Sequence, residues 1–367
     1  MHTKNNTSAF MLYLVIFFLV SQLLLAIVIQ LFPGVLFNPL WFVIIAQLVS
    51  LILPLFIWLK IKNDKFSRHM PRQPLGARNM VHTLLLSFLI LPTMWLVSGI
   101  SSLFVENNIS EFLGSFEAPP LWLMLLAIAV TPGIVEEVVF RGYVQSTQHG
   151  QGVKKIVLMN GLFFAIIHLD IHQFFYTFAL GAVFAYMVYY TKNIWAGIIP
   201  HFIVNGVNVL ISHSVSGANG YVTDVATSPT LGESMYDAFR ETNPELAQQM
   251  YDLLANVSDI AVAIAFMAVL TAITLPFAIW ILFALRQYNT KARLRACFVQ
   301  TTSLEDNRNA VLAKAETPPI AEDITEDGEI ETILPPETIK TKFTIDWCLV
   351  ALIAFYIFIV FIMPLLY

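Results

Sequence analysis

The sequence predicts an all-α membrane protein, a polytopic transmembrane helix bundle of about eight core spans with one extra C-terminal span. Hydrophobic residues make up 57% of the 367 residues and charged residues only 12%, against about 25% charged in an ordinary globular domain. Apolar stretches near the ~20 residues that a bilayer core requires recur along the chain. The sequence contains no nucleotide-binding glycine loop and no nucleic-acid-binding patch, so we expect no nucleic-acid partner.

Hydropathy divides the chain into nine expected spans and the segments between them. The spans cover residues 9–32, 39–60, 82–105, 121–145, 153–170, 173–191, 194–213, 259–286 and 345–367. The parts are an N-terminal two-span hairpin with its basic loop (1–79), a membrane core (80–215), an acidic extracytoplasmic loop (216–258), an eighth span (259–290), an acidic disordered linker (291–344) and a ninth span (345–367). The linker is expected to be disordered because its Glu, Asp, Thr and Pro residues cannot bury a core.

Basic residues recur after every second span and orient the bundle. They are Lys60, Lys62, Lys65, Arg68, Arg72, Arg78, Lys154, Lys155, Lys192, Arg286, Lys291, Arg293 and Arg295. The positive-inside rule places these ends in the cytoplasm. We therefore expect a multi-pass protein of the plasma membrane with a cytoplasmic N-terminus, in contact with the lipid bilayer.

Charged residues inside an apolar span mark the first candidate site. Glu136, Glu137 and Arg141 follow a stretch of ten uncharged residues, 121–130, and each charge costs roughly 2.5–3.5 kcal/mol at the centre of a membrane. Glu137 and Arg141 are four residues apart, so they share a helix face and can pair. Glu136 points about 100° away and stays free for other work. The alternative is a charge cluster at the end of a span, with Arg141 reaching the interface.

Two further spans carry polar residues. Phe164 and His168 are four residues apart near the end of the fifth span, and His201 and Asn205 are four apart in the seventh. Each pair alone is also compatible with hydrogen bonds that hold helices together. His172, which borders the next loop, is expected to be an interface residue.

Taken together, these residues are the parts needed to hydrolyse a carbonyl compound such as a peptide. A carboxylate and a histidine can hold and deprotonate a water molecule, and a second histidine and an amide can donate to an oxyanion. Glu136, His168 and His201 also belong to the residue types that bind zinc, so a Zn²⁺-bound water is the alternative nucleophile. No cofactor is required by the first of these readings.

The ordered set of motifs resembles a known family. Glu136-Glu137-x-x-x-Arg141, Phe164-x-x-x-His168 and His201-Phe202-x-x-Asn205 look like the three motifs of the CAAX protease and bacteriocin-processing (CPBP, or Abi) family, which includes the type II CAAX prenyl endopeptidases. The resemblance covers roughly residues 80–215. It implies that Glu136 and His168 activate water and that His201 and Asn205 stabilise the oxyanion. It also implies that Glu137 pairs with Arg141.

We therefore expect an intramembrane endopeptidase that acts on a membrane-associated, prenylated or otherwise processed peptide. Counting 1.5 Å per residue, Glu136 lies about 8 Å from the inner face, so we expect the active site to open to the cytoplasm. One alternative is a non-catalytic immunity or scaffold member of the same family. The other is a proton-coupled transporter, because buried Glu, His and Arg also suit a proton relay.

Overall fold

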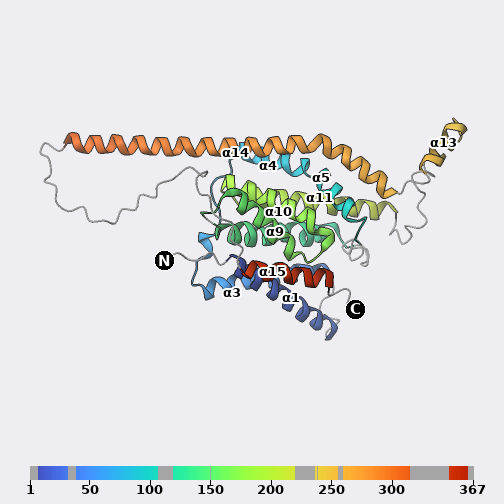
Figure 1. The fold of residues 1–367 in the computed structure, drawn as a ribbon, viewed down its shortest axis with the longest axis horizontal. Helices are drawn as coiled ribbons and strands as arrows, with labels where there is room; N and C mark the ends of the chain where they lie inside the picture. Colours follow the sequence, from blue (N-terminus) through green and yellow to red (C-terminus); the bar gives the residue numbers. More distant parts are fainter. Residues whose placement is uncertain are drawn as a thin grey trace.

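The computed structural model describes residues 7–31, 39–105, 119–148, 150–219, 236–237, 239–254, 259–314 and 347–362. Over these residues the chain is a bundle of helices (Figure 1), joined by turns and by an isolated antiparallel bridge between Arg72 and Asn193. The predicted all-α class is therefore confirmed.

The bundle is built from helices that π-helical and 3₁₀ turns connect in several places. In chain order they are α1 Thr7–Leu31, α2 Pro39–Gln47, η1 Leu48–Ile52, α3 Leu53–Ile61, η2 Phe66–Arg68, α4 Gly76–Leu89, α5 Leu91–Ser101, α7 Leu121–Leu125, η3 Leu126–Val130, α8 Thr131–Glu137, η4 Val138–Val144, α9 Val153–Ile167, α10 Ile171–Thr191, α11 Trp195–Asn219, α13 Pro244–Leu254, α14 Asp259–Lys314, α15 Trp347–Ile357 and η5 Phe358–Ile362.

Seven segments of the described chain are long and apolar enough to cross a membrane. They are Thr7–Val28, Leu40–Ile61, Gly76–Ser101, Leu121–Val144, Ile171–Thr191, Trp195–Ser214 and Ala261–Arg295. Seven of the nine predicted spans correspond to them. The predicted acidic loop 216–258 contains α13, and its residues 220–235 lie outside the described part of the chain.

The predicted spans 153–170 and 345–367 are shorter than expected. α9 has only 15 residues, about 22 Å of helix against a hydrocarbon core of about 30 Å. It ends because Leu169 adopts a left-handed conformation and the Asp170 side chain accepts a hydrogen bond from the His172 N–H, which starts α10. The C-terminal apolar helix covers Cys348–Val360, and residues 363–367 lie outside the described residues.

The prediction of a disordered linker over 291–344 is wrong for its first part. α14 continues as one helix to Lys314 and extends beyond the bundle (Figure 1). The segment from Phe277 to Thr317 contains neither proline nor glycine, so nothing in it interrupts a helix. The acidic, proline-rich composition belongs to residues 315–344, which lie outside the described residues.

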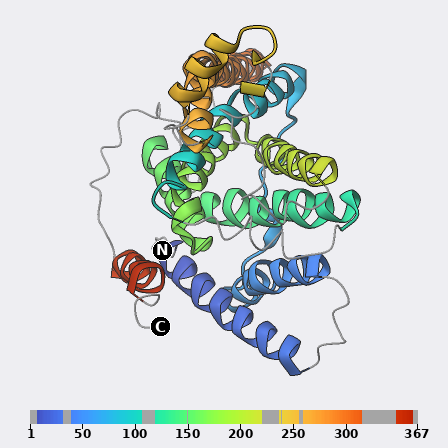
Figure 2. The same cartoon turned by 90° about the vertical axis from the view of Figure 1, so that its right-hand side faces the viewer.

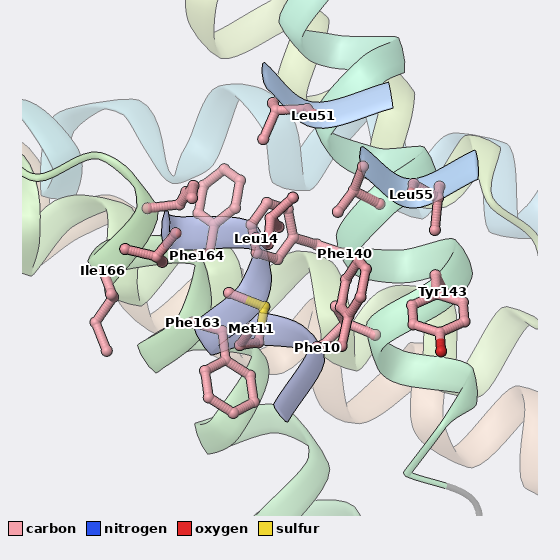
Figure 3. Close-up of a cluster of buried hydrophobic side chains, with 14 of the residues drawn as sticks. Phe10, Met11, Leu14, Leu51, Leu55, Phe140, Tyr143, Phe163, Phe164 and Ile166 are labelled. Carbon is pink, nitrogen blue, oxygen red and sulfur yellow. The ribbon is translucent and has the colours of Figure 1, made fainter. Parts of the chain in front are cut away.

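The N-terminal hairpin supports the helices that carry the motifs. Phe10, Met11 and Leu14 of α1 pack with Phe140 of η4 and Phe163 of α9 in one buried cluster (Figure 3). α15 packs beside α1 in both ribbon views (Figures 1 and 2). Its Leu349, Leu352 and Tyr356 join the same cluster. The C-terminal span is therefore part of the fold.

α9 and α10 approach closely at two glycines. A Cβ on Gly161 would lie 2.7 Å from the Phe178 carbonyl oxygen, and a Cβ on Gly181 would lie 2.9 Å from the Phe164 Cβ. Small residues allow such approach between membrane helices. This contact places Phe164, and one turn later His168, against α10.

Candidate active site

Glu136 and Glu137 lie at the end of α8, in a span that π-helical turns interrupt on both sides. η3 precedes α8 and η4 follows it, and π turns are frequent at functional sites. Pro132 has no N–H to donate to the Ile128 carbonyl four residues earlier. Asn205 Nδ2 donates to that carbonyl instead, at 3.0 Å. This bond ties α11 to the helix that carries the two glutamates.

Glu137 and Arg141 form the ion pair that their spacing predicts. Arg141 Nη1 lies 2.9 Å from Glu137 Oε1, and both side chains are completely buried. Arg141 Nη2 also donates to the Gly181 carbonyl at 3.1 Å. The guanidinium lies 4.4 Å from the ring centroid of Phe164, the residue expected to support the site. These partners compensate the charge of Arg141 inside the protein.

Glu137 has a second partner that sequence reasoning missed. His201 Nδ1 lies 2.9 Å from the same Oε1 atom that binds Arg141. The other oxygen, Oε2, packs against Gly197, where an added Cβ would collide with it. Gly197 and His201 are four residues apart on α11, so one face of this helix holds the carboxylate. Gly197, one turn before His201, was the sequence signal that a side chain from another helix packs against this face of α11.

The Glu136 side chain is free of these constraints. It is 14% exposed, and its Oε2 atom has no hydrogen-bond partner among the described residues. His201 Nε2 lies 3.9 Å from this oxygen. The distance exceeds that of a hydrogen bond, so this buried oxygen is unsatisfied among the described residues. The two adjacent glutamates thus differ: Glu137 is hydrogen-bonded, whereas Glu136 Oε2 has only the 3.9 Å contact with His201.

The hydrogen bond of His168 fixes the position of its proton. Nδ1 lies 2.6 Å from the Phe164 carbonyl oxygen, which can only accept a hydrogen bond. Nδ1 must therefore carry the proton, and Nε2 of the neutral ring keeps its lone pair. His168 packs edge-on against Phe164, with ring centroids 5.0 Å apart. The arrangement leaves Nε2 able to accept a proton.

All four residues expected to do chemistry line one cavity. Glu136, His168, His201 and Asn205 come from α8, the end of α9 and α11, and the cavity has a volume of ≈ 540 Å³. Phe164 lines it as well, whereas Glu137 and Arg141 lie behind the surface. The short α9 ends at His168, so this residue lies in the wall of the cavity that Glu136 also lines.

His172, at the start of α10, is buried inside the protein. It is only 2% exposed, lines the same cavity, and its Nε2 lies 2.9 Å from Ser102 Oγ. It is buried because α10 begins directly after the short α9. A histidine bordering a loop gives no sequence signal of such burial.

The zinc alternative is not supported by the arrangement of the side chains. Among the described residues, no three His, Cys, Asp or Glu side chains are grouped closely enough to hold a metal ion. The Nδ1 atoms of His201 and His168 bond to Glu137 and to a backbone carbonyl, which leaves both Nε2 atoms free to bind a ligand. Glu136, His168 and His201 line one cavity but do not form a three-ligand set.

We expect Gly197→Ala to destabilise the protein and to weaken activity. The added methyl group would displace the Glu137 carboxylate from Arg141 and His201, and overpacking a buried site costs typically about 1–3 kcal/mol. Thermal unfolding in detergent measures the loss. Gly206→Ala on the same helix is the matched control, because its nearest neighbours lie 3.9 Å away. Equal unfolding temperatures for the two variants would contradict the role given to Gly197.

Comparison with known proteins agrees with the motifs. Residues 118–207 match the family model described as Type II CAAX prenyl endopeptidase Rce1-like. The matched range contains the three motifs. It therefore includes all the motif residues that line the cavity, which are Glu136, Phe164, His168, His201 and Asn205. No curated protein and no solved structure matches the chain. The match supports membership in the CAAX protease and bacteriocin-processing family and implies a protease that is integral to a membrane.

Proposed function

We propose that the chain is an intramembrane endopeptidase in which a glutamate and a histidine activate water, and a histidine and an asparagine stabilise the oxyanion. The observation that carries this proposal is that Glu136, His168, His201 and Asn205 line one cavity of ≈ 540 Å³. Peptides that are membrane-associated or lipidated are the expected substrates, because the cavity is enclosed by helices of the membrane bundle.

Glu136 and His168 are suited to activating the water. Glu136 Oε2 lacks a partner among the described residues, and His168 Nε2 has a free lone pair because Nδ1 donates to Phe164. A water held by these two acceptors loses a proton as its oxygen attacks the carbonyl carbon. The same proton then passes to the leaving amine when the C–N bond breaks.

His201 and Asn205 are suited to stabilising the oxyanion. His201 donates from Nδ1 to Glu137, so a second proton on Nε2 would be directed at the substrate. Asn205 uses one amide N–H for Ile128 and keeps a second.

Asn205→Ala tests this assignment. Loss of one oxyanion donor typically lowers kcat by roughly 10²–10³-fold, and KM should change much less. The assay uses purified protein in detergent with a panel of quenched fluorescent peptides. Asn208→Ala is the matched control, because Asn208 lines the same cavity but accepts from Trp95 Nε1. If both variants reduce kcat equally, Asn205 has no special role.

Chelation is expected to leave cleavage unchanged. The proposed mechanism uses only side chains, since the described residues provide no three-ligand set for a metal. The measurement compares cleavage rates before and after dialysis against a strong chelator. Loss of activity that added Zn²⁺ restores would replace the glutamate mechanism with a metal-dependent one.

A further inference from the structure

The turn between α9 and α10 has an unusual backbone directly after His168. Leu169 adopts a left-handed conformation, with a φ of 50°. A side chain larger than that of glycine rarely adopts this conformation, and it persists only where the surrounding structure holds it. The turn ends α9 at the residue that lines the cavity. The groups that hold the turn therefore help to hold His168.

The Asp170 carboxylate holds this turn with both of its oxygens. Oδ1 accepts a hydrogen bond from the His172 N–H at 2.8 Å, and Oδ2 accepts one from Gln173 Nε2 at 2.8 Å. The first bond is that of a helix N-cap, which provides a partner for a backbone N–H that the first turn of a helix leaves unpaired. Asp170 thus fixes the start of α10 two residues after His168.

The hydrogen bonds continue from Asp170 along the first turns of α10. Tyr176 Oη donates to Gln173 Oε1 at 2.9 Å, which orients the Gln173 amide with its nitrogen toward Asp170. His172, Gln173 and Tyr176 all line the cavity, whereas Asp170 does not. Asp170 is therefore placed to act through its neighbours rather than by touching a substrate.

Apolar packing holds the same turn. Leu169 and Phe174 pack against the buried cluster that includes Leu352 and Tyr356 of α15. The ring centroids of Phe174 and Tyr356 are 5.4 Å apart. Burial of the Leu169 side chain helps to compensate its unfavourable backbone conformation. The residues on both sides of Asp170 are thus anchored to the rest of the protein.

We propose that Asp170 is a positioning residue for His168. The proposal rests on the proposed peptidase function, in which His168 Nε2 takes a proton from water. His168 Nδ1 donates to the Phe164 carbonyl in the last turn of α9, so the orientation of the ring depends on how α9 ends. Without the Asp170 carboxylate, α10 loses its cap and Leu169 can leave the left-handed conformation. The end of α9 then changes, and His168 moves with it.

Three single variants test this role in the peptide-cleavage assay. Asp170→Ala should lower kcat by about 10²-fold, the effect of a small misplacement of a reacting group, and KM should change much less. Asp170→Asn keeps an oxygen that accepts from the His172 N–H and should retain most of the wild-type kcat. Asn243→Ala is the matched control, because Asn243 Oδ1 accepts from the Leu246 N–H at the start of α13, away from the cavity.

Two results of this comparison would overturn the proposal. The first is an equal loss of kcat in Asp170→Ala and Asn243→Ala, which would show that loss of any helix cap has the same effect. The second is a loss in Asp170→Asn as large as that in Asp170→Ala, which would assign the effect to the charge of Asp170 instead of to the turn.

A double variant separates positioning from general destabilisation. If Asp170 acts through His168, adding Asp170→Ala to His168→Ala should lower kcat no further, because the group that Asp170 positions is already absent. A further loss as large as that in the wild-type background would overturn the proposal.

NMR of isotope-labelled histidines provides a readout that does not depend on catalysis. The His168 ring is identified as the signal missing from His168→Ala. We expect a proton on its Nδ1 in the wild type and in Asp170→Asn, and loss of this signature in Asp170→Ala. An unchanged signal in Asp170→Ala would overturn the positioning role even in an active peptidase. A changed signal in a protein that cleaves no peptide would support the positioning role and overturn the peptidase function.

Discussion

Glu136→Gln should lower peptide cleavage by roughly 10²–10⁴-fold, the usual contribution of a general base, without unfolding the protein. The amide keeps the size of the carboxylate but cannot take a proton from water. Glu136 forms no hydrogen bond through Oε2 with the described residues and is partly exposed to the cavity. Stability should therefore be unchanged, and the loss should appear in kcat.

The control for this variant is Glu245→Gln, which makes the same change on the exposed first turn of α13, away from the cavity. Cleavage rates and thermal unfolding are measured for both proteins in the same detergent. A Glu136→Gln protein that cleaves the peptide panel at the wild-type rate would remove Glu136 from the mechanism. The transporter alternative would gain support if proton flux into proteoliposomes, rather than cleavage, depended on Glu136.

Arg141→Met should destabilise the protein by about 3–5 kcal/mol, because removal of one member of a buried ion pair leaves the other charge uncompensated. Glu137 and Arg141 are both completely buried and lie 2.9 Å apart. The double variant Glu137→Gln/Arg141→Met removes both charges and should recover much of the stability. Thermal unfolding of the two single variants and the double variant measures the coupling.

The exposed ion pair between Arg240 and Asp237 provides the control. Its side chains are 55% and 62% exposed, and such pairs contribute little to stability. Arg240→Met should leave the unfolding temperature unchanged. If Arg141→Met were as mild as Arg240→Met, the buried pair would not support the site. The double variant should remain inactive even when stable, because Glu137 also holds His201.

The spacing of residues along the sequence predicted the contacts and shared faces that lie within a single helix. Glu137 and Arg141 pair because they are four residues apart, and the same spacing placed His201 and Asn205 on one face of α11. Apolar length located the long spans. The contact between Glu137 and His201 joins residues from α8 and α11, and no spacing within either helix reveals it.

The errors of sequence reasoning also have physical causes. α9 is short because Leu169 and Asp170 form a turn inside an apolar stretch, which hydropathy does not detect. Residues 291–314 were wrongly expected to be disordered because the acidic, proline-rich composition was taken as typical of the whole range 291–344. The prolines begin only at Pro318, so α14 continues to Lys314. The packing of Met70 against Gly142 joins distant parts of the chain, so no local pattern reveals it.

The central claim is that Glu136 and His168 act together on one water molecule in this cavity. The most direct measurement compares kcat/KM for wild type, Glu136→Gln, His168→Ala and the double variant on one cleaved peptide. Groups that act as a unit have non-additive effects, so the double variant should be no slower than the slower single variant. A double loss equal to the product of the two single losses would contradict the account, as would a wild-type protein that cleaves no peptide.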